Sequence, residues 1–308
     1  MNTENKCTTE HKEIGCILCP RTCRIDRGKQ PGYCGMTDTV LVSRAALHMW
    51  EEPVISGENG SGTVFFAGCN LKCIFCQNHE IAHATAETKA KAVTPNALCD
   101  LFFMLKDKGA HNINLVTPTH FIPEIREALL TARGRGLGLP IVYNTSSYEN
   151  VSALQMLDGL IDVYLPDLKF YDPAIAEECA HAPDYFKTAA EAIGEMFRQV
   201  GEPVFENDLM KKGIIVRHLV LPGHTNDSKN ILKYLYETYH DRIYISIMNQ
   251  YTPMEHMKNH TLLGRKVTKR EYERIVNYAL DLGIQNAFIQ EGDVAKESFI
   301  PPFDLTGL

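Results

Sequence analysis

The chain has 308 residues, which is enough for one large α/β domain and a small additional segment. Apolar residues make up 44% and charged residues 22%, and 31 basic against 38 acidic residues give a net charge of −7. This balance argues against a nucleic-acid backbone as the main partner. No apolar run approaches the ~18 residues of a membrane span, and the polar start of the chain lacks the apolar part of a secretory signal. We therefore expect a cytoplasmic protein without a membrane partner.

Residues 1–60 form a cysteine-rich N-terminal segment that is punctuated by Gly and Pro. Four of its cysteines have the spacing C-x2-C-x3-C-x10-C, namely Cys16, Cys19, Cys23 and Cys34. Four thiolates are a complete ligand set for a closed metal centre, which can be zinc or an iron–sulfur cluster. Because ten cysteines occur without an export signal, metal binding is favoured over a disulfide framework. We expect a second metal here, and the spacing leaves zinc and iron–sulfur both open.

Residues 61–308 form the main domain, which ends in a C-terminal extension, and short apolar runs alternate there with longer helical patterns. We expect strands at 64–67, 113–116, 141–144, 163–168, 214–221 and 244–248, with a weaker candidate at 287–290. We expect helices at 95–108, 123–135, 151–157, 174–200, 228–240 and 268–282. The last helix begins with Thr268 and Glu271 at capping-box spacing and closes at Gly283. The alternation implies a parallel sheet covered by helices.

Three further cysteines lie directly after the first expected strand. Cys69, Cys73 and Cys76 have the spacing C-x3-C-x2-C, and Phe75 precedes the third. Thiolates this close on one loop can converge on one cluster, and soft sulfur ligands select iron–sulfur clusters, zinc or Cu(I). A cubane [4Fe–4S] cluster normally takes four cysteines, so three leave one iron open. An open position is typical of a catalytic metal site, whereas a zinc knuckle would need a distant fourth ligand.

This loop and its apolar lead-in resemble the signature loop of the radical S-adenosylmethionine (SAM) superfamily. The stretch 63–78 most resembles the branch that contains the pyruvate formate-lyase activating enzyme and its uncharacterised relatives. The resemblance implies a partial (β/α)6 TIM-like barrel with a [4Fe–4S] cluster on Cys69, Cys73 and Cys76. It also implies that SAM binds the open iron and is cleaved reductively to a 5′-deoxyadenosyl radical that abstracts hydrogen. Cys7, Cys99 and Cys179 stand apart from both cysteine sets.

The resemblance also predicts a SAM site at the carboxyl ends of the strands, where parallel barrels place their functional residues. Activating enzymes usually carry Gly-Gly-Glu after the second strand, but this chain has Val116-Thr117-Pro118-Thr119-His120. We expect the backbone carbonyls of Thr117 and Pro118 to accept hydrogen bonds, and Thr119 and His120 to replace the missing groups. The competing reading is a buried turn that Thr119 and His120 stabilise.

The later strand ends complete the expected site. Asp167 and Lys169 resemble the Asp-Leu-Lys of activating enzymes, with a salt bridge at the barrel mouth as the alternative. Arg217 and His218 must point to opposite faces of a strand, and by the family pattern we expect Arg217 to face the lumen and bind the SAM carboxylate. The whole expected cofactor-binding set is Phe75, Asn78, Thr117, Pro118, Thr119, His120, Asn144, Ser146, Asp167, Lys169, Arg217, Met248 and Asn249.

The sequence leaves three kinds of function open. The first is a radical SAM enzyme that activates a glycyl radical enzyme, with a low-potential donor such as flavodoxin or ferredoxin as the source of electrons. The second is a radical SAM enzyme that modifies a peptide or small molecule directly. The third is a metal-binding scaffold or redox sensor in which both cysteine sets are structural. The sequence assigns no catalytic acid, base or nucleophile.

Overall fold

The computed structural model describes residues 15–290 and 301–308, so Cys7 lies outside the described residues. Its centre is one mixed, mostly parallel sheet in the order β10-β9-β8-β6-β5-β4-β2-β1-β3, with β7 paired to β8. The strands are β1 (Val40–His48), β2 (Ser61–Phe66), β3 (Lys91–Val93), β4 (Ile113–Val116), β5 (Ile141–Thr145), β6 (Val163–Pro166), β7 (Val204–Glu206), β8 (Leu209–Leu219), β9 (Tyr244–Met248) and β10 (Ala287–Ile289).

Six parallel strands, from β2 through β4, β5, β6 and β8 to β9, form the partial (β/α)6 barrel that the sequence predicts. The strands β2, β4, β5 and β6 are buried along their whole length. Helices cover their outer face, and their inner face points into the lumen of the barrel. β10 extends the parallel sheet beyond β9, and β1 extends it at the other end by pairing antiparallel to β2. In the described residues no ladder joins these two ends, so the barrel is open on one side.

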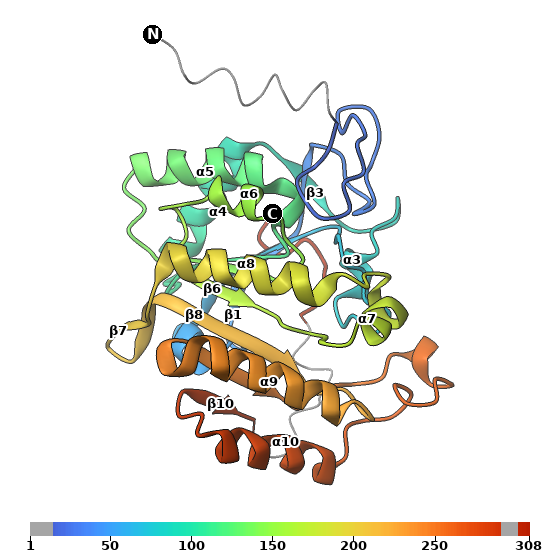
Figure 1. The fold of residues 1–308 in the computed structure, drawn as a ribbon. Coiled ribbons are helices and arrows are strands. Elements are labelled where there is room, and N and C mark those ends of the chain that lie inside the picture. The colour runs from blue at the N-terminus through green and yellow to red at the C-terminus, as the bar shows by residue number, and fades with distance from the viewer. Residues whose placement is uncertain (1–14, 291–300) are drawn as a thin grey trace.

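The helices lie outside the sheet, and Figure 1 shows them stacked along its outer face. They are α2 (Pro53–Ser56), α3 (His79–Ala82), α4 (Pro95–Asp107), α5 (Ile122–Gly134), α6 (Val151–Gln155), α7 (Pro173–Ala180), α8 (Tyr185–Val200), α9 (Thr225–Tyr239) and α10 (Lys269–Leu282), with 3-10 turns η1 (Thr119–Phe121), η2 (His240–Arg242) and η3 (Glu255–Met257). Within the described ranges, none of these helices has both the length and the apolar character needed to cross a membrane.

Two predicted boundaries differ from the structure. Residues 40–48 were expected in the N-terminal segment, but β1 forms part of the central sheet, with Ala46 opposite Thr63 of β2. The single helix expected over 174–200 is two helices, because His181 adopts a left-handed conformation (φ 49°, ψ 45°) that ends α7. The cysteine-rich part that remains outside the sheet, residues 15–39, is called the head below. Figure 1 shows the head on the side toward which the β8 arrow points, near α3 and α7.

The capping box expected at the start of α10 is confirmed. The Thr268 hydroxyl accepts from the Glu271 backbone N–H at 3.2 Å, and the Thr268 backbone N–H donates to the Glu271 carboxylate at 2.9 Å. Gly283 closes the helix with φ 86°, a left-handed value that suits glycine. Each end of α10 is therefore fixed by residues whose identity the sequence already shows.

We expect Thr268→Ala to lower the free energy of unfolding by about 1 kcal/mol, because it leaves the Glu271 N–H without its cap. Thr268→Ser keeps the hydroxyl and is the matched control. Urea titration followed by circular dichroism measures both variants. Equal stability of the Ala and Ser variants would show that the cap contributes nothing to α10.

Candidate functional site

A cavity of 230 Å³ lies at the carboxyl ends of the barrel strands, and the three signature cysteines line it. Most of the residues expected to bind SAM line the same cavity. They are Phe75 and Asn78 from the cysteine loop, Thr117, Asn144 and Ser146 from the ends of β4 and β5, and Asp167, Lys169, Arg217 and Met248 from β6, β8 and β9 and their loops. Residues that are up to 179 positions apart in sequence meet here because parallel strands place their carboxyl ends at one rim.

The cysteine loop between β2 and α3 folds tightly over the cavity. Gly68 enters it with φ 86°, where a Cβ would lie 2.5 Å from the Met36 side chain, so only glycine fits this entry. The Leu71 backbone N–H donates to the Cys69 sulfur at 3.4 Å, and the Cys76 N–H donates to the Cys73 carbonyl at 3.1 Å. Burial raises the pKa of the Cys76 thiol to about 12.

The donor set of this loop fits a cubane cluster. Three sulfurs on one loop line one cavity, and a backbone N–H points at one of them, as is usual for cluster sulfurs. Cys69, Cys73 and Cys76 would hold the cluster, and three cysteine ligands would leave its fourth iron free for another ligand.

A buried ion network lines the same cavity as the cysteines, and its Lys169 is near Cys73. Asp167 accepts from Arg217 Nε at 2.8 Å through one oxygen and from Lys169 Nζ at 2.6 Å through the other. Burial opposes ionisation of Asp167, but the two cations outweigh it and hold the pKa of this carboxyl below its usual value. Arg217 also donates to the Asn144 side-chain oxygen at 2.6 Å. His218 points the other way, toward the Ser228 hydroxyl at 2.8 Å, as strand alternation predicts.

Tyr185 of α8 fixes the two strand ends that carry this network. Its fully buried hydroxyl lies 2.8 Å from the carbonyl oxygens of Ser146 and Asp167, and it accepts from the Lys169 backbone N–H at 3.0 Å. One side chain from the helix layer thus ties the end of β5 to the loop after β6. Tyr185 is a positioning residue that the sequence did not single out.

Four of the expected residues do not line the cavity, namely Pro118, Thr119, His120 and Asn249. The Thr119 hydroxyl donates to Glu149 at 2.6 Å behind the cavity wall. His120 lies 2.7 Å from the Ala67 carbonyl, and burial lowers its pKa to about 3, so the imidazole is neutral. These contacts match the buried-turn alternative, and a contact of Thr119 or His120 with SAM stays a prediction. The Asn249 backbone N–H donates to the Gln290 side chain at 2.8 Å.

Glu51 is the cavity residue that sequence reasoning missed. It lies between β1 and α2, and its carboxylate accepts from the side-chain amides of Asn114 at 3.1 Å and Asn144 at 3.2 Å. Its second oxygen lies 3.3 Å from Arg217. Glu51 thus brings a carboxylate into the lumen of a barrel that lacks the glutamate expected after its second strand. The signal available was Trp50-Glu51-Glu52-Pro53, an acidic pair in a segment with few apolar runs.

A parallel barrel with three cysteines and a paired Asp–Arg–Lys network at one rim defines a cofactor-dependent enzyme class rather than a closed structural metal site. A family model described as the radical SAM superfamily matches residues 63–235. The match spans more than half of the chain, so this protein belongs to the radical SAM superfamily. A [4Fe–4S] cluster and SAM are the cofactors that membership of this superfamily implies.

The chain is similar to one curated relative and to several solved structures. "Uncharacterized protein MJ0674" of Methanocaldococcus jannaschii is 28% identical over 280 residues, which cover 87% of this chain and 76% of the relative. Streptococcus suis SuiB is 15% identical with a TM-score of 0.51 over 76% of this chain and 49% of SuiB. Methylornithine synthase (PylB) is 15% identical with a TM-score of 0.50 over 72% of this chain and 60% of PylB. The chain thus spans only part of these solved structures, and at such identities they show the fold alone.

Glu149 is a buried carboxylate directly behind the cavity wall. One of its oxygens accepts from the hydroxyls of Thr119 at 2.6 Å, Thr145 at 2.6 Å and Tyr143 at 3.1 Å. The other oxygen is buried without a hydrogen-bond partner. Burial raises the pKa of Glu149 to about 7, although the three donors oppose the shift. The native fold therefore favours the protonated acid.

We expect the Glu149 shift to make stability depend on pH. Since the folded-state pKa of about 7 exceeds the ordinary value of 4.5, its contribution is present below pH 4.5 and is lost as the pH rises through 7. The loss should amount to about 3 kcal/mol at about 1.4 kcal/mol per pKa unit. Glu149→Gln keeps an acceptor but cannot ionise, so its free energy of unfolding should fall less over this range. Parallel pH dependence in the two proteins, measured by denaturant titration, would contradict the assignment.

Proposed function

We propose that this chain uses the radical SAM cofactor pair to abstract hydrogen from a protein or peptide segment, and that a glycyl radical enzyme is such a partner. One observation carries the proposal: the signature cysteines and the Asp167–Lys169–Arg217 network line a single cavity. When bound, the cluster and SAM supply a 5′-deoxyadenosyl radical. The roles of the protein are to hold both groups, to orient them and to exclude water.

The cavity residues divide these tasks by their chemistry. Arg217 and Lys169 are the two cations available for a carboxylate, and Asp167 aligns both. Phe75 is buried against Phe170 and Tyr251, with ring centroids at 6.1 and 5.9 Å, and it presents a rigid aromatic edge to the cavity. This arrangement supports an adenine contact at Phe75 and a methionine carboxylate toward Arg217 and Lys169.

A second, wider cavity of 780 Å³ supports a large substrate. It is lined by residues 49–53, 56–57 and 287–290, and it shares Trp50, Glu51, Arg217, Met248 and Gln250 with the first cavity. It lies on the open side of the barrel, along β10, which pairs only with β9 in the described part of the chain. An extended segment can add to such a strand edge through main-chain hydrogen bonds. A backbone lying there would reach the first cavity through the shared residues.

Hydrogen abstraction from such a segment can be tested with peptides. The probe is a glycine-containing peptide whose glycine carries two deuterons on Cα, incubated anaerobically with the reconstituted protein, SAM and dithionite. The Cα–D bond breaks, deuterium passes to the C5′ carbon of the deoxyadenosyl radical, and a glycyl radical remains on the peptide. Mass spectrometry should find deuterium in 5′-deoxyadenosine.

Two matched variants test whether the peptide binds in the wider cavity. Ile289→Glu places a charge on β10 in the wider cavity, and it should lower deuterium transfer. Leu280→Glu changes a more exposed apolar residue on α10 outside both cavities, and it should not. Unlabelled 5′-deoxyadenosine with every peptide would reject the peptide substrate and favour a small molecule. No 5′-deoxyadenosine from a cluster-loaded protein would reject the enzyme in favour of a scaffold.

We expect Cys73→Ala to abolish SAM cleavage, because a loop with two cysteines cannot hold three irons of a cubane. Cys73 is buried at the centre of the loop and lines the cavity. The measurement is 5′-deoxyadenosine output by liquid chromatography, with iron content determined in parallel. Cys99→Ala, in the core side of α4, is the matched control and should keep both. Wild-type output from Cys73→Ala would overturn the ligand assignment.

We expect Arg217→Ala to weaken SAM binding by about 1.5–3 kcal/mol, the range for a hydrogen bond to a charged group. Iron content should be unchanged, because Arg217 is not one of the three cysteine ligands and its hydrogen bonds go to Asp167, Asn144 and Glu51. Asn114→Ala is the matched control, since Asn114 binds the same Glu51 but does not line the cavity. Equilibrium binding of SAM to the reconstituted protein measures both. An unchanged dissociation constant for Arg217→Ala would place the SAM carboxylate elsewhere.

A further inference from the structure

The head folds its four cysteines toward one another without a helix or a strand. The Cys16 backbone N–H donates to the Ile25 carbonyl at 2.9 Å, and the Arg24 N–H returns to the Cys16 carbonyl at 2.9 Å. The Thr22 N–H donates to the Cys19 carbonyl at 3.0 Å, and Thr22 and Arg24 adopt φ values of 41° and 53°. Left-handed turns at non-glycine residues are uncommon and are maintained only where the surroundings require them. Two such residues, Thr22 and Arg24, flank Cys23.

Gly32 lies beside two of the sulfurs. A Cβ on Gly32 would be in van der Waals contact with both, at 3.5 Å from the Cys23 sulfur and 3.7 Å from the Cys34 sulfur, so these two sulfurs flank the same residue. The next residue, Tyr33, donates its backbone N–H to the Cys23 sulfur at 3.3 Å. An N–H directed at a sulfur is the contact that stabilises metal-bound thiolates. The signature loop has the same contact between Leu71 and Cys69.

The head brings its cysteine side chains near one another. Cys34 lies within electrostatic reach of Cys16 and Cys23, and Cys19 lies within reach of Cys16 and Cys34. The signature loop, for which membership of the superfamily implies a [4Fe–4S] cluster, shows the same features: neighbouring cysteines and a backbone N–H directed at one of the sulfurs. This likeness favours an iron–sulfur cluster over zinc in the head.

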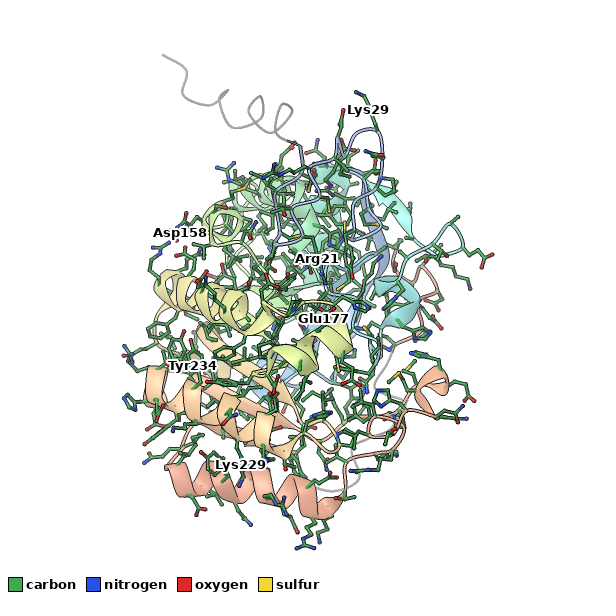
Figure 2. All side chains as sticks on the ribbon, turned by 45° about the vertical axis from the view of Figure 1, so that its right-hand side comes forward. Arg21, Lys29, Asp158, Glu177, Lys229 and Tyr234 are labelled. Carbon is green, nitrogen blue, oxygen red and sulfur yellow. The ribbon has the colours of Figure 1, made fainter. Side chains whose placement is uncertain are left out.

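The head is in direct contact with the signature loop. The Cys69 backbone N–H donates to the Cys34 carbonyl at 3.3 Å, so one hydrogen bond joins a ligand of each set. The Asn70 side chain lies beside the Cys19 thiol. Arg21 donates to the backbone carbonyls of Asn70 and Ala180, each at 2.8 Å, and Figure 2 shows it on the side of the head near Glu177 of α7. These hydrogen bonds of Arg21 fix the position of the head relative to the signature loop.

We propose that Cys16, Cys19, Cys23 and Cys34 bind a second iron–sulfur cluster, and that it passes electrons to the signature loop. A one-electron donor of the ferredoxin or flavodoxin class reduces the head cluster. That electron then crosses the Cys34–Cys69 contact to the signature cluster, and the head cluster returns to its oxidised state. The proposed metal site depends only on the contacts within the head, whereas the proposed electron transfer also depends on the proposed function.

The metal site is tested without any SAM chemistry. The variant Cys69/Cys73/Cys76→Ala is reconstituted anaerobically with iron and sulfide and analysed for iron, sulfide and zinc. We expect about four irons and four sulfides per chain, and a cluster signal by electron paramagnetic resonance after reduction. One zinc without sulfide, or a folded chain without metal, would overturn the iron–sulfur site. Because the signature cysteines are absent, neither result depends on the proposed function.

Electron transfer is tested by comparing reductants on the chain with both sites. Cys19→Ser should leave reduction of the signature cluster by dithionite unchanged, because this small reductant reaches it directly. Reduction by reduced ferredoxin should be lost, as followed by electron paramagnetic resonance. Cys99→Ser is the matched control and should respond like the wild type to both reductants. Equal reduction of Cys19→Ser by ferredoxin would overturn the transfer and leave the metal site standing.

Discussion

The Asp167 carboxylate, shared between Arg217 and Lys169, is the interaction around which the rest of the site is arranged. A buried charge is tolerated only when it is paired and fully hydrogen-bonded, so these three groups must meet in one geometry. Their meeting fixes the end of β6 against β8. Through Asn144 and Glu51, the same guanidinium also fixes the end of β5 and the turn between β1 and α2. The network therefore sets the shape of the lumen before any cofactor binds.

The positions of the supporting residues follow from this constraint. Tyr185 reaches in from α8 to hold the carbonyls at both strand ends, and Gln77 donates to the Gln250 carbonyl at 2.9 Å, which ties the cysteine loop to the loop after β9. The backbone around the cysteines and around Asp167 and Lys169 is thus held in place by side chains that are not themselves part of the ion network. A site built in this way can place two large cofactors without relying on loop motion.

The sequence predicts the features that depend on local pattern. The buried strands, the capping box at Thr268 and the Arg217–His218 alternation follow from periodicity and spacing, and all appear in the structure. It does not predict what depends on the tertiary fold. The residues of β1 include the polar Ser43 and Arg44, and the sequence places them in the N-terminal segment. Pairing with β2 makes them a strand of the central sheet. Thr119 was assigned by its place after β4, but the buried Glu149 carboxylate, 30 residues away, takes its hydroxyl.

The same reasoning explains why a glutamate from outside the barrel strands lies in the lumen. The lumen brings Glu51 and Asp167 together with Arg217 and Lys169, and Glu52 lies near Arg217 as well. Burial raises the pKa of Glu52, which limits its charge, whereas Arg217 and Lys169 keep Asp167 ionised. SAM carries a sulfonium cation and a carboxylate. If SAM binds here as the proposed function requires, a lumen with acceptors as well as cations suits both of its charged groups, and Glu51 is a carboxylate in the lumen where the turn after β4 has none.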